Sequence, residues 1–177
     1  MTSSRGFKPV AWLARWRVRF GFAVGAAAFV LARPTWHSWQ VGFVVALAGE
    51  AIRVWAAGHV EKGREVTRSG PYRWTGHPLY VGSALVAAGA VLATRNVVVA
   101  VVAALYLGST IAAAVRTEEA DLQRAFGSAY DDYRASRGEP MDRRFSLARA
   151  IRNREYRAVV GVLGGFALLA LRLIVLL

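Results

Sequence analysis

Five apolar segments, each close to the length of a membrane-spanning helix, constrain this chain more than any other feature. They comprise residues 20–32, 39–60, 79–94, 97–115 and 158–177. A hydrocarbon core of about 30 Å requires about 20 residues of helix. The first segment is short, but Arg19 and Arg33 at its ends have long side chains that reach towards the interfaces. The sequence therefore predicts an all-α integral membrane protein with five transmembrane helices.

Basic residues mark one side of the predicted membrane. Five Lys and Arg precede the first segment, four lie in residues 61–78 and ten in residues 116–157, whereas the other side has only Arg33 and Arg95. Cytoplasmic loops carry such an excess, so we expect a cytoplasmic N-terminus and an outer C-terminus. We interpret the net charge of +12 as this topology signal and expect no nucleic-acid partner, because the loops lack a motif for base readout. The Arg- and Ala-rich composition favours a bacterial inner membrane.

The predicted cytoplasmic loops also contain helical patterns. Apolar residues at helical spacing predict that the fourth segment continues as an amphipathic helix. These residues are Leu122, Phe126, Ala129, Tyr130 and Tyr133. Gly138 and Pro140 are expected to end this helix. The basic stretch 143–157 predicts an interfacial helix on anionic headgroups. Arg95 and Asn96 alone join the third and fourth segments, which predicts an antiparallel hairpin. Without repeats or a low-complexity linker, we expect a single domain, residues 1–177.

The loop of residues 69–80, SGPYRWTGHPLY, is the first candidate for chemistry. Pro78 disfavours the α conformation for His77 and suits the first position of a helix, so the third helix is expected to begin here. Its free N–H groups, flanked by Arg73 and His77, would suit a carboxylate or a phosphate. For Pro78 alone, an ordinary helix start after a basic loop explains the sequence equally well.

Acidic residues next to or within the apolar segments are the second candidates. Glu118 shares a helix face with Leu122 and is expected to point into an apolar environment, whereas Glu119 fits either a site or a solvated surface. Glu50 and Arg53 lie three residues apart inside the second segment, where ionisable groups usually face a bundle interior. They form either a structural pair or part of a site.

The remaining polar residues exclude some chemistry. The chain has no cysteine, which excludes thiolate nucleophiles and cysteine metal sites. We interpret His59 as an interfacial polar residue, and His37 lies on the opposite side of the predicted membrane. We expect no metal site.

These pieces together resemble the isoprenylcysteine carboxyl methyltransferase family, whose wider group includes membrane phospholipid N-methyltransferases. The shared pattern is Gly-Pro-Tyr-Arg at 70–73, His-Pro-x-Tyr-x-Gly at 77–82, a transmembrane hairpin, Glu-Glu at 118–119, and Phe-Gly-x-x-Tyr-x-x-Tyr at 126–133. The resemblance covers about residues 50–140. The family commonly has Arg before the His-Pro pair; Gly76 stands there in this chain, and Arg73 is near enough in sequence to substitute.

The resemblance implies a helical methyltransferase that binds S-adenosylmethionine at cytoplasmic helix ends and releases S-adenosylhomocysteine. Its acceptor would be lipophilic or lipid-anchored, such as a prenylcysteine-type carboxylate, and would arrive from the bilayer. The catalytic candidates are Glu118 and Arg53, with Glu118 acting as a base only for an amine or thiol acceptor. The implied cofactor-binding residues are Arg73, His77, Pro78, Leu79, Tyr80, Gly82, Glu118 and Glu119.

A non-enzymatic membrane protein with a small-ligand binding or transport role is the alternative. Glu50, Arg53 and the missing Arg at Gly76 favour it. A methyltransferase requires His77 and Glu118 around one pocket, whereas a transporter requires a polar path centred on Glu50 and Arg53. The small residues at 82–89 suit packing within one chain or between copies, so the oligomeric state stays open.

Overall fold

The computed structural model describes residues 9–137, 139 and 141–175. These residues form seven α-helices and one 3₁₀ helix, with no strand among them, which confirms the all-α class. The elements are α1 (Pro9–Leu31), α2 (Trp36–Ala57), η1 (Gly70–Arg73), α3 (Pro78–Thr94), α4 (Val97–Phe126), α5 (Ser128–Arg134), α6 (Leu147–Arg152) and α7 (Tyr156–Val175).

Each of the five apolar segments forms a helix, but they differ in length. Three helices, α2, α4 and α7, are long and apolar enough to cross a membrane. The apolar part of α1, Arg19–Leu31, and the whole of α3 are shorter. The described residues therefore contain three candidate membrane spans, and five crossings remain a prediction.

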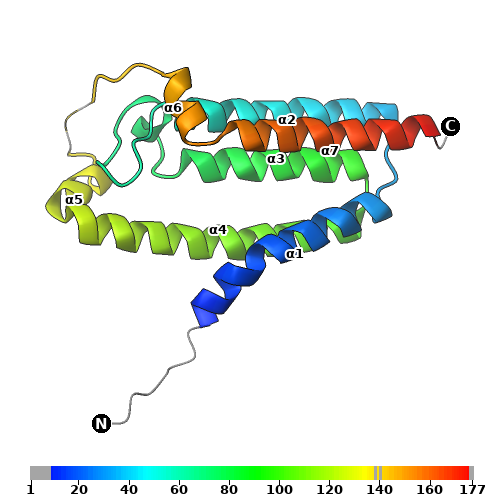
Figure 1. Ribbon diagram of the computed structural model, residues 1–177, viewed down its shortest axis with the longest axis horizontal. Coiled ribbons are helices and arrows are strands. Elements are labelled where there is room, and N and C mark those ends of the chain that lie inside the picture. Colours follow the sequence, from blue (N-terminus) through cyan, green and yellow to red (C-terminus); the bar gives the residue numbers. More distant parts are fainter. Residues whose placement is uncertain (1–8, 138, 140, 176–177) are drawn as a thin grey trace, which may run out of the picture.

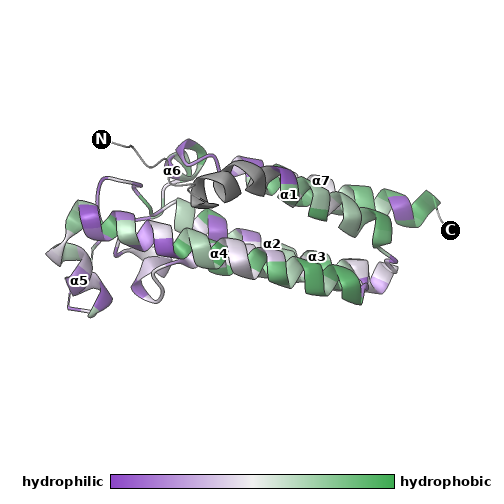
Figure 2. Cartoon of the chain, turned by 90° about the horizontal axis from the view of Figure 1, so that it is seen from below, coloured by the Kyte–Doolittle hydropathy of each residue, from purple (hydrophilic) through white to green (hydrophobic). Residues whose placement is uncertain are grey.

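The five long helices, α1, α2, α3, α4 and α7, alternate in direction, and the two longer connections, between α2 and α3 and between α4 and α7, lie at one end (Figure 1). Helix α2 packs against both α3 and α7, and α4 packs against α3 and α1. In Figure 1, α4 and α1 appear below α3. Helices α5 and α6 and the loop around η1 occupy one end, which we call the loop end, and the C-terminal end of α7 lies at the other (Figure 1). Hydrophobic residues predominate along the long helices and hydrophilic residues at the loop end (Figure 2).

The closest helix contact is between the backbones of α2 and α3. Gly49 faces Gly82 and Gly42 faces Gly89, so that two glycine pairs lie seven residues apart along each helix. A Cβ atom on Gly49 would lie 2.7 Å from the carbonyl oxygen of Gly82, closer than real Cβ atoms approach. Small residues at such positions let helices pack backbone to backbone.

Aromatic side chains attach α7 to the half of α2 far from the loops. Trp39 stacks on Phe43 with ring centroids 5.0 Å apart, and Phe43 lies 5.2 Å from Phe166 of α7. The indole N–H of Trp39 donates to the carbonyl oxygen of Phe166 over 2.8 Å. This bond satisfies the polar atom of Trp39 inside an apolar cluster.

The turn between α3 and α4 forms the predicted hairpin at the far end. Arg95 has a positive φ of 49°, and the side chain of Asn96 accepts hydrogen bonds from the N–H groups of Val98 and Val99, which caps α4. The Asn96 amide also donates to the carbonyl oxygen of Leu31 over 2.9 Å. From this turn the two helices diverge towards the loop end (Figure 1).

Two predicted loop helices differ from the structure. The extension of α4 is interrupted at Gly127, whose φ is +47°, and resumes as α5 up to Arg134; the predicted end at Gly138 and Pro140 lies outside the described residues. The predicted interfacial helix over 143–157 was too long. Within it, α6 has only six residues, because Ser146 caps its start and Arg154 has a φ of +62°; residues 156 and 157 already belong to α7.

The close contact between α2 and α3 at Gly49 predicts how a substitution there changes stability. Gly49→Ala should lower the thermal unfolding midpoint in detergent by several degrees, because relieving the overlap costs about 1–3 kcal/mol. Gly108→Ala on α4 is the matched control, since a Cβ there meets nothing within 4 Å. If both variants were equally stable, the close approach of α2 and α3 would be wrong.

Candidate active site

A cavity of about 950 Å³ opens between α3 and α4 at the loop end. Residues from α1, α2, α3, α4 and α5, the loop around η1, and Glu155 just before α7 line it. Its volume is near the upper end of the range of small-molecule sites, about 300–1,000 Å³. Polar side chains line the part near the loops, and small or apolar side chains line the part that extends along α4.

His77 lies at the start of α3, where the sequence predicts it. It caps the helix with φ −133° and ψ 54°, and Pro78 follows as the first helical residue. The His77 Nε2 atom lies 3.3 Å from Glu119 Oε1, whereas its Nδ1 atom is buried without a hydrogen-bond partner among the described residues. Leu79, as the second helical residue, has no carbonyl one turn earlier to accept its N–H. His77 and Leu79 both line the cavity.

The paired carboxylates at the loop end of α4 have different surroundings. Glu118 lines the cavity together with Asp121 and Leu122. Glu119 does not line it and instead contacts His77. The two neighbouring residues therefore offer one carboxylate to a ligand and one to the imidazole.

The other predicted cofactor-binding residues divide in the same way. Leu79 and Tyr80 line the cavity, and Pro78 is fully buried. Arg73 lies outside the lining, where its Nη2 atom donates to the carbonyl oxygen of Met141 over 3.4 Å. Gly82 faces α2, and a Cβ on it would lie 2.6 Å from the carbonyl oxygen of Gly49.

Arg53 faces the cavity from α2 and is held by three side chains. Its Nη2 atom lies 2.6 Å from Glu155 Oε1, its Nε atom lies 3.4 Å from Glu50 Oε2, and its Nη1 atom donates to the hydroxyl of Ser83. Glu50 and Glu155 are only 5% and 7% exposed, so one guanidinium balances two buried carboxylates. The predicted pair of Glu50 and Arg53 forms, with Glu155 as a third member.

The sequence did not lead us to predict Glu155 as a site residue, although its position contains a signal. It is the only acidic residue in the basic stretch 143–157. A single carboxylate among so many arginines at the start of an apolar helix indicates a buried partner rather than a solvated charge.

Two tyrosines that the sequence analysis did not assign to the site, Tyr72 and Tyr133, complete the wall near η1. The hydroxyl of Tyr133 donates to the carbonyl oxygens of Tyr72, over 2.9 Å, and Thr75, over 3.4 Å, and so attaches α5 to the loop around η1. Burial, followed by the charge of Glu118, raises the pKa of Tyr72, which keeps its phenol protonated. Beside them, a Cβ on Gly76 would lie 3.8 Å from Tyr133 Oη, so a larger side chain has room there.

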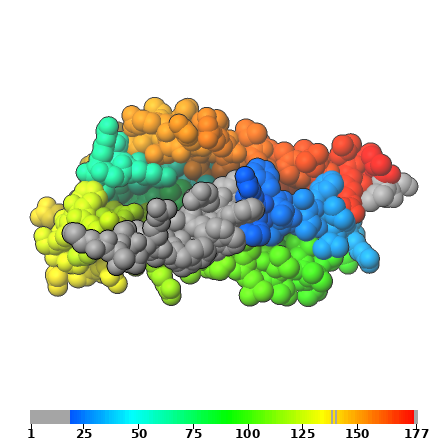
Figure 3. Space-filling view, turned by 60° about the horizontal axis from the view of Figure 1, so that its bottom comes forward, coloured from blue at the N-terminus to red at the C-terminus, as the bar shows by residue number. Residues whose placement is uncertain are grey.

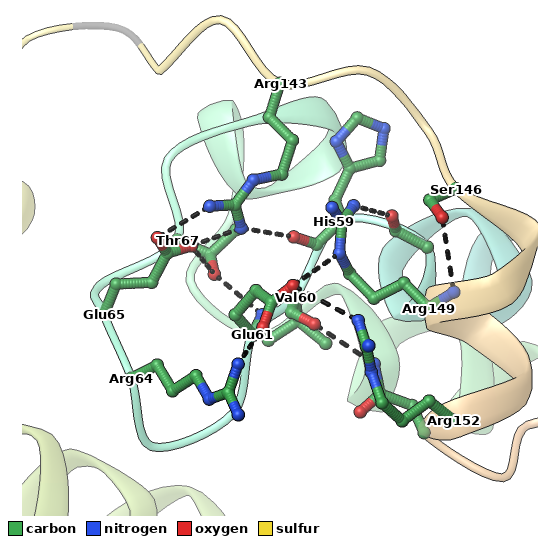
Figure 4. A network of polar contacts seen from close by, with 12 residues as sticks. His59, Val60, Glu61, Arg64, Glu65, Thr67, Arg143, Ser146, Arg149 and Arg152 are labelled. Atoms are coloured by element: carbon green, nitrogen blue, oxygen red, sulfur yellow. Dashed lines mark hydrogen bonds and ion pairs between the residues drawn. The ribbon is translucent and has the colours of Figure 1, made fainter.

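The loop of residues 59–69 forms another wall of the cavity, and ion pairs hold it in place (Figure 4). Arg143 Nη2 donates to Glu65 Oε2 over 2.7 Å, and Arg149 Nε donates to Glu61 Oε1 over 3.0 Å. His59 Nδ1 lies 3.1 Å from the hydroxyl of Ser69. Burial, and then the charges of Arg149, Arg143 and Arg73, lower the pKa of His59. Its side chain is buried within the protein.

The class that this fold and cavity define is an integral membrane protein with a polar site at one end of its helices. Comparison with known families identifies that class more closely. A model of the family described as phospholipid methyltransferase matches residues 24–129, more than half of the chain, and the chain belongs to this family. The family is part of the same group of membrane methyltransferases as the isoprenylcysteine enzymes, so the predicted resemblance is confirmed.

Two further comparisons gave no significant match, one with curated proteins and one with solved structures. The matched region extends from α1 into α5 and contains His77, Glu118 and Arg53. Membership establishes a membrane methyltransferase, and the family is generally dependent on S-adenosylmethionine.

The lowered pKa of His59 predicts a pH dependence of stability. In the folded state the pKa of His59 lies below 6.5, the value of an ordinary histidine. The contribution of neutral His59 to the free energy of unfolding is therefore fully present above pH 6.5 and is lost as the pH decreases below it. His59→Asn, which keeps a polar atom near Ser69, should weaken the fall of the thermal midpoint as the pH decreases below 6.5. His37→Asn, at the exposed far end, should keep the wild-type slope; an unchanged slope in His59→Asn would contradict the assignment.

Proposed function

We propose that this protein transfers a methyl group from S-adenosylmethionine to a lipophilic or lipid-anchored acceptor at the cytoplasmic face of the membrane. The observation that carries the proposal is that His77 and Glu118 line one cavity, which continues between α3 and α4 towards Arg53. The bound sulfonium would supply an activated methyl group. The protein's task is then to hold both reactants in line and to exclude water.

In this proposal the cofactor occupies the part of the cavity nearest the loops. The unpartnered Nδ1 of His77 and the N–H of Leu79 would bind its carboxylate end. The ring of Tyr80 would lie against the adenine or the sulfonium, where an aromatic face favours positive charge. Glu118 would accept hydrogen bonds from the ribose or the ammonium group.

The residues that do not line the cavity act as positioning residues. Glu119 orients the His77 ring, and Pro78 fixes the start of α3. Gly82 leaves space for the aliphatic part of Arg53, whose Cγ would meet a Cβ placed there. Arg73 remains a candidate for the cofactor carboxylate only through a movement of its side chain from Met141.

The acceptor would enter the part of the cavity that follows α4. This wall has small and hydroxyl-bearing side chains, Ser109, Thr110, Ala113, Ala114 and Thr117. An apolar chain fits such a groove, and Arg53, held by Glu155, faces its polar end. A carboxylate acceptor requires no deprotonation, whereas an amine or thiol acceptor would use Glu118 as the base.

The transport alternative has less support than methyl transfer. Glu50, Arg53 and Glu155 contact one another and Ser83 rather than forming a polar row along the bundle. Arg53 and Glu155 also line the same cavity as His77 and Glu118. Because residues from α1 to the start of α7 share this cavity, we propose that residues 1–177 act as one domain.

Calorimetric titration of the purified protein with S-adenosylmethionine and S-adenosylhomocysteine tests the cofactor site. We expect saturable binding that weakens on the order of tenfold or more in His77→Ala and Glu118→Ala, because each removes a charged or polar contact. His37→Ala and Glu139→Gln are matched controls outside this cavity and should bind as the wild type does. The absence of binding in both detergent and lipid, with folded protein, would refute the proposal.

Gly76 allows a gain-of-binding test. The cavity has room beside it, so Gly76→Arg should fold and bind S-adenosylhomocysteine several-fold more tightly, since the guanidinium can pair with the ligand carboxylate. Gly76→Glu places the opposite charge at the same position and should weaken binding. Equal affinities for the two variants would show that the ligand carboxylate lies elsewhere.

A further inference from the structure

The surface beside the cavity wall contains more guanidinium groups than its carboxylates can balance (Figure 4). Glu61 Oε1 lies 3.0 Å from Arg149 Nε and 3.4 Å from Arg152 Nη2, and Glu61 Oε2 lies 3.5 Å from Arg64 Nη1. Glu65, the other carboxylate of the network, is bound by Arg143. Four guanidinium groups therefore share two carboxylates.

The two outer arginines of this network are only weakly held. The side chains of Arg64 and Arg152 are 80% and 66% exposed, whereas that of Arg149 is 15% exposed. Exposed ion pairs contribute little to stability. Arg64 and Arg152 contact different oxygens of Glu61 (Figure 4), and because both side chains are exposed, their guanidinium groups remain accessible to a second anion.

Apolar side chains next to these arginines lie at the level where the membrane should end. Asn153 donates to the carbonyl oxygens of Ala57, over 2.8 Å, and Val60, which places α6 directly beyond the last residues of α2. Leu147 and Ile151, four residues apart on one face of α6, are 60% and 53% exposed. Apolar groups with flanking arginines are typical of surfaces that enter the bilayer interface.

We propose that α6 and the loop of residues 59–69 bind an anionic phospholipid of the bilayer. Leu147 and Ile151 enter the interface, and Arg64 and Arg152 bind the lipid phosphate, for which guanidinium groups are well matched. In the space-filling view the loop (teal) lies between α6 (orange) and α5 (yellow), at the outer surface (Figure 3).

Lipid binding at this surface should also affect ligand binding in the cavity. Val60, Glu65 and Val66 belong to the same loop and line the cavity wall. A phosphate held by Arg64 and Arg152 fixes this loop against α6, so anionic lipid should tighten ligand binding in the cavity. This coupling rests on the proposed function, whereas the lipid site does not.

The test compares two matched pairs of substitutions in nanodiscs of phosphatidylcholine alone or of equal parts phosphatidylcholine and phosphatidylglycerol. The first variant is Arg64→Gln with Arg152→Gln. The control is Arg124→Gln with Arg137→Gln, which removes the same charge from exposed arginines that also pair with carboxylates, at the other side of the loop end. Native mass spectrometry counts the phosphatidylglycerol retained, and thermal unfolding measures its stabilising effect.

We expect phosphatidylglycerol to be retained by the wild type and the control, and to raise their thermal midpoints. The Arg64/Arg152 variant should bind it on the order of tenfold more weakly and lose the rise. Equal losses in both variants would show a net-charge effect and overturn the site, as would equal retention of both lipids by the wild type. Equally tight binding of soluble glycerol phosphate in detergent would overturn the assignment to a bilayer lipid.

The dissociation constant for S-adenosylhomocysteine in the two nanodiscs tests the coupling separately. A several-fold lower value with phosphatidylglycerol supports it, and equal values remove it. A protein that retains phosphatidylglycerol through Arg64 and Arg152 but binds no S-adenosylhomocysteine would refute methyl transfer and leave the lipid site intact.

Discussion

The direct contact between the backbones of α2 and α3 is the constraint on which the rest of the structure depends. Two glycine pairs bring these helices together, and Arg53 passes along α3 beside Gly82 to reach Ser83. Gly82 and Ser83 of α3 thereby face α2, whereas Tyr80, on a different side of α3, lines the cavity. Because α4 touches α3 closely only near their connecting turn, the space between them at the loop end becomes the cavity.

The charged cluster around Arg53 joins this helix pair to the last helix. A charge inside a membrane-spanning segment is costly unless it is paired, and breaking one member of a buried pair leaves an uncompensated charge. Arg53 meets that requirement with Glu50 from its own helix and Glu155 from the residue just before α7. The cluster thus fixes the start of α7 against α2 near the loops, while Trp39 and Phe166 fix it farther along. Both contacts support the wall that Arg53 presents to the cavity.

Features that depend on local sequence were predictable, and those that depend on contacts between distant segments were not. The helix start at His77 follows from Pro78, and the five long helices follow from the apolar runs, although α1 begins at Pro9, before the predicted residue 20. The side of α3 that Gly82 occupies depends on which helix packs there, which a motif alone does not reveal. Likewise, Arg143 and Arg149 bind the loop of residues 59–69, a tertiary contact over more than 70 positions that the local sequence does not reveal.

The distribution of charge links the topology of the protein to its site. The chain has a formal charge of +12, yet the charged residues that line the cavity are four carboxylates, Glu65, Glu118, Asp121 and Glu155, and two cations, Arg53 and Lys62. The excess arginines lie on the outside of the loop end, where an anionic bilayer surface would attract them. Basic residues that orient the chain in a membrane would repel a cationic ligand if they lined the site. In the proposed function, their separation from the cavity lets one protein face anionic headgroups while the cavity offers a sulfonium an environment of carboxylates and aromatic rings.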